Sequence, residues 1–311
     1  MPVHFGVSLP QIKRTWQETK AAAVEFEGLG FDSVWVNDHL YGIPAPHLPI
    51  LEAWTTLAAV GAVTDRVRLG TLVSPVGFRN PALLAKIAAT VDEIAPGRVI
   101  VGLGSGWFQQ EFAGYGFPFP TVQQRLEQLD EAATLMKQMW TEDSPTFAGR
   151  HFHTDSVFCS PKPRKPPSLL FGGGGERVLL RLAAKHADIW NNLAVSQVEL
   201  GHKVEVLRAH CEKIGRDPRE IVVSQQCLVV IGSDENDARA KVERARQIYG
   251  GHLGAGGPLS IAGTPDQCIE KIAAHVDLGC TMFVIEFFGR DTREPARLFA
   301  EEVMAKARSL S

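Results

Sequence analysis

Residues 168–190 read SLLFGGGGERVLLRLAAKHADIW, and the order of elements in this stretch decides the fold. The apolar run Ser168–Phe171 predicts a buried strand, and a glycine run separates it from a helical pattern at Arg177–His186. A second short strand is predicted at Ala187–Trp190. A helix between two strands is typical of a parallel sheet.

The same alternation continues in both directions along the chain. A helical pattern follows each of eight predicted strands, which are Val3–Ser8, Asp32–Val36, Val67–Thr71, Arg98–Leu103, Ser168–Phe171, Ala187–Trp190, Ile221–Val230 and Met282–Glu286. Eight such units in 311 residues predict a closed (β/α)8 TIM barrel. An open doubly wound α/β sheet is the alternative.

No linker divides the chain, so we expect residues 1–311 to form a single domain with insertions. The three insertions are expected near residues 107–120, 144–167 and 250–263. The middle one contains TFAGRHFHTD, which has the turn chemistry of a β-hairpin.

The composition excludes several classes of protein. Hydrophobic residues make up 45% of the chain and charged residues 22%, as in ordinary globular proteins. The net charge is -3 with both signs interspersed, which predicts no nucleic-acid surface. No apolar run is long enough to span a membrane. The five cysteines are scattered and form no CxxC pair, so we expect a cytoplasmic protein without a metal site.

The glycine run is the clearest candidate for a binding site. In a TIM barrel the active site lies at the carboxyl ends of the strands, and this run follows the fifth strand. Gly172, Gly173, Gly174 and Gly175 would leave bare N–H groups beside a helix N-terminus, which suits a phosphate. Arg177 in the first helical turn could add a charge-assisted bond. A flexible turn is the alternative.

Other strand ends supply weaker candidates. His39 follows the second strand with Asp38 beside it, and an imidazole there can exchange a proton with a substrate oxygen. A structural histidine bonded to a loop carbonyl is the alternative. Ser105 and Gly106 end a second glycine-rich strand, where a flat ring could approach the backbone or the barrel could simply turn a corner. Trp107 opens an aromatic loop that could wall an apolar pocket.

Taken together, these motifs resemble the bacterial luciferase-like flavin and deazaflavin oxidoreductases, and within them the coenzyme F420-dependent branch. The resemblance covers nearly the whole chain. It rests on GFDSVWVNDH, RVRLGTLVSPVGFRNPALLAK, GRVIVGLGSGW, LLFGGGGERVLLRLAAKHADIWN and AGTPDQCIEKIAAHVDLGC.

The resemblance implies a TIM barrel, often homodimeric, that holds coenzyme F420 at the barrel mouth and acts on a small-molecule substrate. It implies that His39 and Asp38 are catalytic residues, with His39 as the base, and that a cis peptide bond at Thr71–Leu72 supports the ring. The implied cofactor-binding residues are Thr71, Leu72, Val73, Ser105, Gly106, Gly172, Gly173, Gly174, Gly175, Glu176 and Arg177.

Two positions depart from the sugar-phosphate dehydrogenases of that branch. Trp107 stands where they carry a glutamate, and Ile43 stands near the place of their tryptophan. We therefore expect Trp107 to line a pocket for a more apolar substrate. The expected activity is hydride transfer between F420 and that substrate. Two alternatives are an FMN-dependent monooxygenase and a non-catalytic flavin-binding protein of the same fold.

Overall fold

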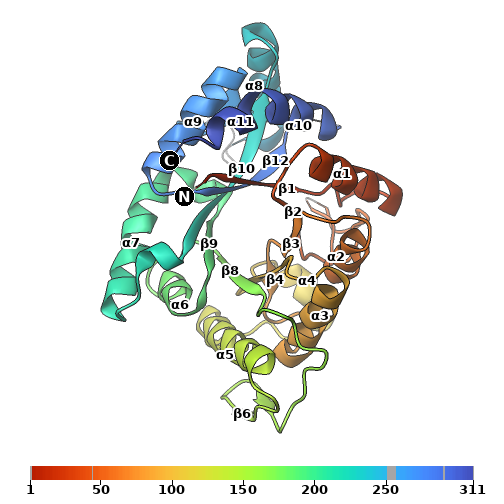
Figure 1. Ribbon diagram of the computed structural model, residues 1–311, viewed down its shortest axis with the longest axis vertical. Helices are drawn as coiled ribbons and strands as arrows, with labels where there is room; N and C mark the ends of the chain where they lie inside the picture. The colour runs from red at the N-terminus through yellow and green to blue at the C-terminus, as the bar shows by residue number, and fades with distance from the viewer. Residues whose placement is uncertain (1, 44, 251–256, 290, 311) are drawn as a thin grey trace.

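The computed structural model describes residues 2–43, 45–250, 257–289 and 291–310. Strands surround a common axis and helices lie outside them (Figure 1). The barrel strands are β1 (His4–Ser8), β2 (Ser33–Val36), β3 (Arg68–Thr71), β5 (Val99–Gly104), β8 (Ser168–Gly172), β9 (Ile189–Asn192), β10 (Val222–Ile231) and β12 (Met282–Phe287). All eight predicted strands are thus confirmed, with bounds that differ by one or two residues.

The strands close into a barrel in chain order. Each pairs in parallel with its neighbours in sequence, β9 pairs with β10, and β12 returns to pair with β1. Because β1 and β12 share a ladder from His4–Met282 to Val7–Ile285, the sheet has no open edge there. This closure confirms the TIM barrel and excludes the open sheet.

The helices form the outer layer. They are α1 (Trp16–Gly28), α2 (Ala53–Gly61), α3 (Pro81–Ile94), α5 (Val122–Thr141), α6 (Leu179–His186), α7 (Leu200–Lys213), α8 (Glu235–Tyr249), α9 (Pro265–Asp277), α10 (Arg293–Phe299) and α11 (Ala305–Ala307). Several begin at side-chain caps readable in the sequence. Asn80 accepts from the N–H of Ala82 with Pro81 at the first helical position, and Thr264 forms a capping box with Gln267.

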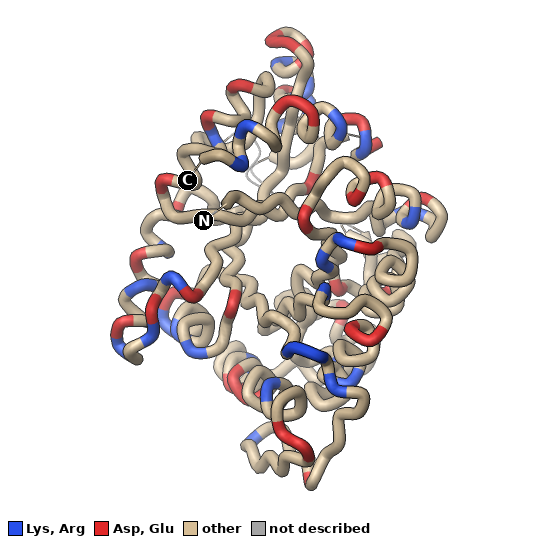
Figure 2. The backbone as a smooth tube through the Cα atoms, in the orientation of Figure 1, with Lys and Arg blue, Asp and Glu red and all other residues tan. Residues whose placement is uncertain are grey.

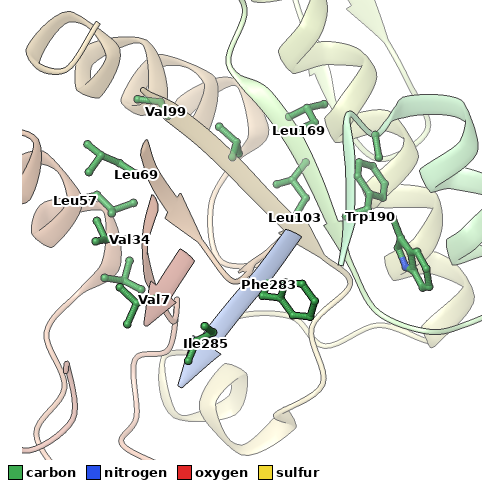
Figure 3. Close-up of a cluster of buried hydrophobic side chains, with 14 of the residues drawn as sticks. Val7, Val34, Leu57, Leu69, Val99, Leu103, Leu169, Trp190, Phe283 and Ile285 are labelled. Atoms are coloured by element: carbon green, nitrogen blue, oxygen red, sulfur yellow. The ribbon is translucent and has the colours of Figure 1, made fainter. Parts of the chain in front are cut away.

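The main hydrophobic core lies between the strands and the helices. Alternate strand residues such as Val34, Leu69 and Leu103 belong to it, and Leu57 of α2 lies close to Val34 and Leu69 (Figure 3). A second apolar cluster fills the barrel itself. It consists of Trp35, Leu72, Ile100, Leu170, Ile189, Met282 and Val284. The barrel is therefore packed below its mouth, as the fold requires.

The insertions carry the remaining short elements. The expected hairpin forms between β6 (Phe147–Ala148) and β7 (His153–Thr154). The loop near 107–120 contains a short helix, α4 (Gln109–Gly114), and residues 74–75 add β4 beside β5. The third insertion contributes β11 (Ile261–Gly263) against β10, while its residues 251–256 lie outside the described residues.

Charged residues of both signs are distributed around the outer helices and are largely absent from the barrel strands (Figure 2). Among the described residues, no helix combines the length and the apolar character needed to cross a lipid bilayer.

Candidate active site

The backbone alternation of β2 separates the two residues that were both predicted to be catalytic. Trp35 points into the barrel and Val34 and Val36 point toward the helices, so His39 returns to the barrel side while Asp38 faces outward. Asp38 is accordingly fully buried, whereas the His39 side chain is 17% exposed at the mouth.

His39 is paired with a carboxylate that sequence analysis did not identify. Its Nδ1 lies 2.9 Å from Oε2 of Glu111, which is 1% exposed. The other oxygen of Glu111 accepts from the main-chain N–H groups of Leu40 and Tyr41. An ionised carboxylate can only accept, so Nδ1 of His39 carries the proton and Nε2 is left as an acceptor.

Glu111 belongs to the short helix α4, 72 residues away from His39 in the chain. Burial acts to raise the pKa of Glu111, but the hydrogen bonds from His39, Tyr41 and Leu40 outweigh it and hold that pKa below its ordinary value. The carboxylate therefore fixes both the tautomer of His39 and the loop that follows β2.

Asp38 serves a different part of the structure. Its carboxylate accepts from Nη1 of Arg79 at 2.6 Å and from Nη2 at 3.1 Å, and the Ser74 hydroxyl donates to it at 2.5 Å. Arg79 also donates to Glu52, the N-cap of α2, at 2.5 Å. Burial raises the pKa of Asp38 even though the Arg79 guanidinium opposes that shift. Asp38 thus joins β2 to β4 and the segment that leads into α3, behind the site.

The end of β3 turns the chain into the mouth. Thr71 is buried and its hydroxyl bridges to the main chain of Gly102 in β5 at 3.1 Å, while Leu72 joins the apolar cluster inside the barrel. A cis peptide is present, but it joins Leu72 to Val73, so the prediction of Thr71–Leu72 was wrong by one residue. The reason is that the N–H of Leu72 still donates to Val36 of β2, so strand pairing continues past Thr71.

Three glycines make room for Val73 at this turn. A Cβ at Gly104 or at Gly172 would lie 2.6 or 2.8 Å from the Val73 side chain. A Cβ at Gly102 would lie 1.9 Å from the carbonyl oxygen of Thr71. The glycine-rich strand ends are therefore required by the close approach of the residue 71–73 segment to β5 and β8.

The glycine run has the free donors expected of an anion site. The N–H of Gly173 donates to Asn191, but the N–H groups from Gly174 to Val178 donate to no acceptor among the described residues. Helix α6 begins at Leu179, so the prediction that Arg177 lies in its first turn was wrong. The reason is a wide turn closed by the N–H of Leu180 on the carbonyl of Gly175, with no side-chain cap.

The residues after β5 lie around His39. The indole of Trp107 is 67% exposed, stacks on Phe108 with ring centroids 5.2 Å apart, and meets the His39 imidazole edge-on at 5.9 Å. Ser105 accepts from Arg125 through its carbonyl, and Gly106 has φ +79° and packs against Phe112. Trp107 therefore lies beside the imidazole, while Gly106 packs within its own loop.

Polar groups cover the apolar cluster on the mouth side. Asn37, Asn191 and Glu286 stand two residues after Trp35, Ile189 and Val284 in the chain. Nδ2 of Asn191 is buried and has no hydrogen-bond partner among the described residues. The carboxylate of Glu286 forms no hydrogen bond or ion pair with the described residues, and burial raises its pKa. Such uncompensated groups are typical of a binding site.

Metal ligation is not indicated by the part of the chain that the structure describes. No three His, Cys, Asp or Glu side chains there gather as ligands to one ion, and the five cysteines are free and buried.

Comparison with known proteins identifies the family to which this chain is similar. The sequence profile of the luciferase-like monooxygenases matches residues 1–257. The F420-dependent glucose-6-phosphate dehydrogenase of Intrasporangium calvum is 30% identical over 92% of this chain and 93% of its own. The enzyme of the same name from Nakamurella multipartita is 28% identical over 99% of this chain and 98% of its own.

Solved structures share the fold over the full length of the chain. An F420-dependent secondary alcohol dehydrogenase in complex with an F420-acetone adduct superimposes with a TM-score of 0.83 at 23% identity, covering 98% of this chain and 99% of its own. The monooxygenase RslO1 from Streptomyces bottropensis gives 0.82 at 22% identity, covering 97% and 99%. Sequence profile, relatives and fold agree, and the chain belongs to the luciferase-like monooxygenase family.

Proposed function

We propose that this protein is a coenzyme F420-dependent oxidoreductase that transfers a hydride between the deazaflavin and a small organic carbinol or carbonyl compound. The observation that carries the proposal is the run of main-chain N–H groups from Gly174 to Val178, which find no acceptor among the described residues. The relatives of this chain named above are F420-dependent enzymes. These donors fit the phosphate of the cofactor, with Arg177 exposed beside them.

The segment after β3 fits the ring of the same cofactor. Val73 lies against Gly104 and Gly172 between β5 and β8, so it can support a flat ring from below. Thr71 and Leu72 precede Val73 and are both buried, so they fix the position of Val73. When bound, F420 supplies a carbon centre that accepts or donates a hydride, and the protein orients it and excludes water.

His39 is the residue that moves a proton in this proposal. Its Nε2 takes the hydroxyl proton of a carbinol as hydride leaves, or returns it to a carbonyl in the reverse direction. Glu111 stabilises the imidazolium that forms and keeps Nδ1 protonated at 2.9 Å. We assign Asp38 a positioning role in place of a catalytic one, because its carboxylate binds Arg79 and Ser74 behind the strand.

The surroundings of His39 favour a substrate with an apolar flank. Trp107 and Phe108 present stacked aromatic surfaces next to the imidazole. The sugar phosphate in the names of the relatives is not part of the proposal, since Trp107 and Ile43 occupy the positions that depart from those enzymes.

Titration with purified cofactors tests the proposal. We expect F420 to bind more tightly than FMN, followed by a change in F420 absorbance when a secondary alcohol with an apolar side chain is added. Tighter binding of FMN, with oxygen consumption after reduction, would instead identify an FMN-dependent monooxygenase. Binding of either cofactor without turnover of any alcohol or carbonyl would identify a carrier protein.

Replacing Glu111 with glutamine should lower the melting temperature at pH 7 by about 5 °C, because charged hydrogen bonds to His39 and Tyr41 are weakened. The folded protein holds the pKa of Glu111 below its ordinary value of 4.5. The stabilisation is therefore present above that value and is lost as pH falls, so the two melting curves should converge between about pH 5 and 3. Glu212→Gln, at an exposed position, is the control and should show no such convergence.

We also propose that residues 1–311 act as one domain in a cytoplasmic homodimer that binds no nucleic acid. The free cysteines support a reducing compartment. Leu83 of α3 and Phe158 are exposed apolar side chains, and Lys86 of α3 donates to Ser160 in the segment that carries Phe158. Light scattering should give twice the chain mass of 34.0 kDa.

A further inference from the structure

A buried lysine contacts the glycine run. Lys203 of α7 has a side chain only 7% exposed, and its Nζ donates to the carbonyl oxygen of Gly174 at 2.9 Å. A Cβ built on Gly174 would lie 3.1 Å from the same Nζ, so nothing separates the ammonium from the run. A cation in this place would be expected to attract any phosphate bound above it.

Two carboxylates surround that ammonium. Glu199 Oε2 lies 2.9 Å from Nζ of Lys203 and Glu176 Oε1 lies 3.7 Å from it. The hydrogen bond and the charge of Lys203 lower the pKa of Glu199, which is therefore ionised at neutral pH. The ammonium of Lys203 therefore has a carbonyl oxygen and a carboxylate within hydrogen-bond distance, and a second carboxylate within ion-pair distance.

The formal charges around the run add to zero. Lys203 and Arg177 are positive, and Glu176 and Glu199 are negative; His202 lies 3.2 Å from Glu176 and adds a positive charge only when protonated. The bound phosphate would then be held mainly by the N–H groups from Gly174 to Val178, which are dipoles and not full charges.

The two candidate cofactors differ at this group. FMN ends in a phosphomonoester whose second ionisation has a pKa near 6, so it carries between one and two negative charges at neutral pH. F420 carries its phosphate as a diester, which has a single ionisation and one negative charge. We infer that Glu199 and Glu176 neutralise Lys203 so that the glycine run selects a phosphodiester over a phosphomonoester.

This inference rests on the proposed function. It assigns the preference for F420 over FMN to the two carboxylates that neutralise Lys203. The second charge of FMN would lie near two carboxylates that already offset Lys203, and only the exposed Arg177 remains unpaired among the described charges of the run. Both glutamate side chains are partly exposed, at 55% for Glu199 and 41% for Glu176, so solvent weakens the repulsion and the selection is a matter of several-fold preference.

The test measures Kd by fluorescence titration for F420, FMN and the two phosphate-free ring compounds, riboflavin and the deazaflavin riboside. Comparison of FMN with riboflavin isolates the contribution of the phosphomonoester from that of the ring, whereas F420 differs from the riboside by its anionic tail as well as by the phosphodiester. The variants are Glu199→Gln, Glu176→Gln and the double variant. Glu205→Gln removes the same charge from α7, where Glu205 pairs with Arg208, and is the matched control.

We expect the ratio of Kd for FMN to Kd for F420 to fall roughly threefold to sixfold for each carboxylate removed, and to stay unchanged in Glu205→Gln. Riboflavin binding should not change in any variant. An unchanged ratio, or an equal fall in the control, would overturn the inference while leaving F420 as the cofactor. If the wild-type protein itself prefers FMN, the proposed function fails first.

Discussion

His39→Ala should reduce the rate of F420-linked hydride transfer by roughly 10²–10⁴-fold, the usual contribution of a positioned acid or base. The expectation follows from geometry: Glu111 holds Nδ1 at 2.9 Å and leaves Nε2 as the group that can exchange a proton with substrate. The Kd for F420 should stay within about twofold, because the proposed phosphate and ring contacts come from the glycine run and Val73. Stopped-flow absorbance with a secondary alcohol measures the first quantity and titration the second.

The matched control for this experiment is His153→Ala, at an exposed position of the hairpin formed by β6 and β7. Its turnover should equal that of the wild type. If His39→Ala retains full activity across alcohols and carbonyl compounds, the proton is carried by another group and the assignment of His39 is wrong.

Asp38→Ala should destabilise the folded protein by about 3–5 kcal/mol, the usual effect of breaking a buried ion pair by removing one partner. The variant would leave the guanidinium of Arg79 largely buried with only Glu52 at 2.5 Å to offset its charge. It would also remove the nearer of the two acceptors of the Ser74 hydroxyl and leave only Thr71 Oγ1 at 3.2 Å. Urea unfolding measures the change in free energy. Asp65→Ala, at an exposed loop position, should change stability by less than about 0.5 kcal/mol.

A double variant separates the contributions of the pair. Asp38→Ala with Arg79→Ala removes both charges, so we expect it to lose less than the sum of the two single variants. Full additivity would show that the two side chains contribute independently, contrary to the contacts of 2.6 and 3.1 Å between them.

The features that could be predicted from the sequence are the repeated strand–helix units and the motifs formed by neighbouring residues. Eight apolar runs separated by helical patterns predicted the barrel, and the bounds hold because each strand is a short buried segment between turn residues. The position of the glycine run after the fifth strand also followed from the chain alone. Its free N–H groups are a property of backbone that lacks side-chain caps.

Two features of the site could not be obtained in that way. Glu111 contacts His39 although 72 residues separate them in the chain. Its loop lacks apolar periodicity, so no strand or helix pattern in the sequence indicates that Glu111 belongs to the site. Its position four residues after Trp107, on a short helical turn, is the only signal that we can identify. Asp38 and His39 are neighbours in sequence and were predicted to act together. Extending the alternation of β2 by three residues, from Val36 to His39, would have placed them on opposite sides of the strand.

The close fit of Val73 against Gly102, Gly104 and Gly172 also indicates where this protein tolerates redesign. Any side chain added at those three positions would collide with backbone or with Val73, so none of the three should be substituted in redesign. Trp107 is the opposite case, because two-thirds of its indole faces solvent and Phe108 covers one of its sides. Libraries meant to widen or shift substrate scope should therefore vary the aromatic rim and keep the glycine wall constant.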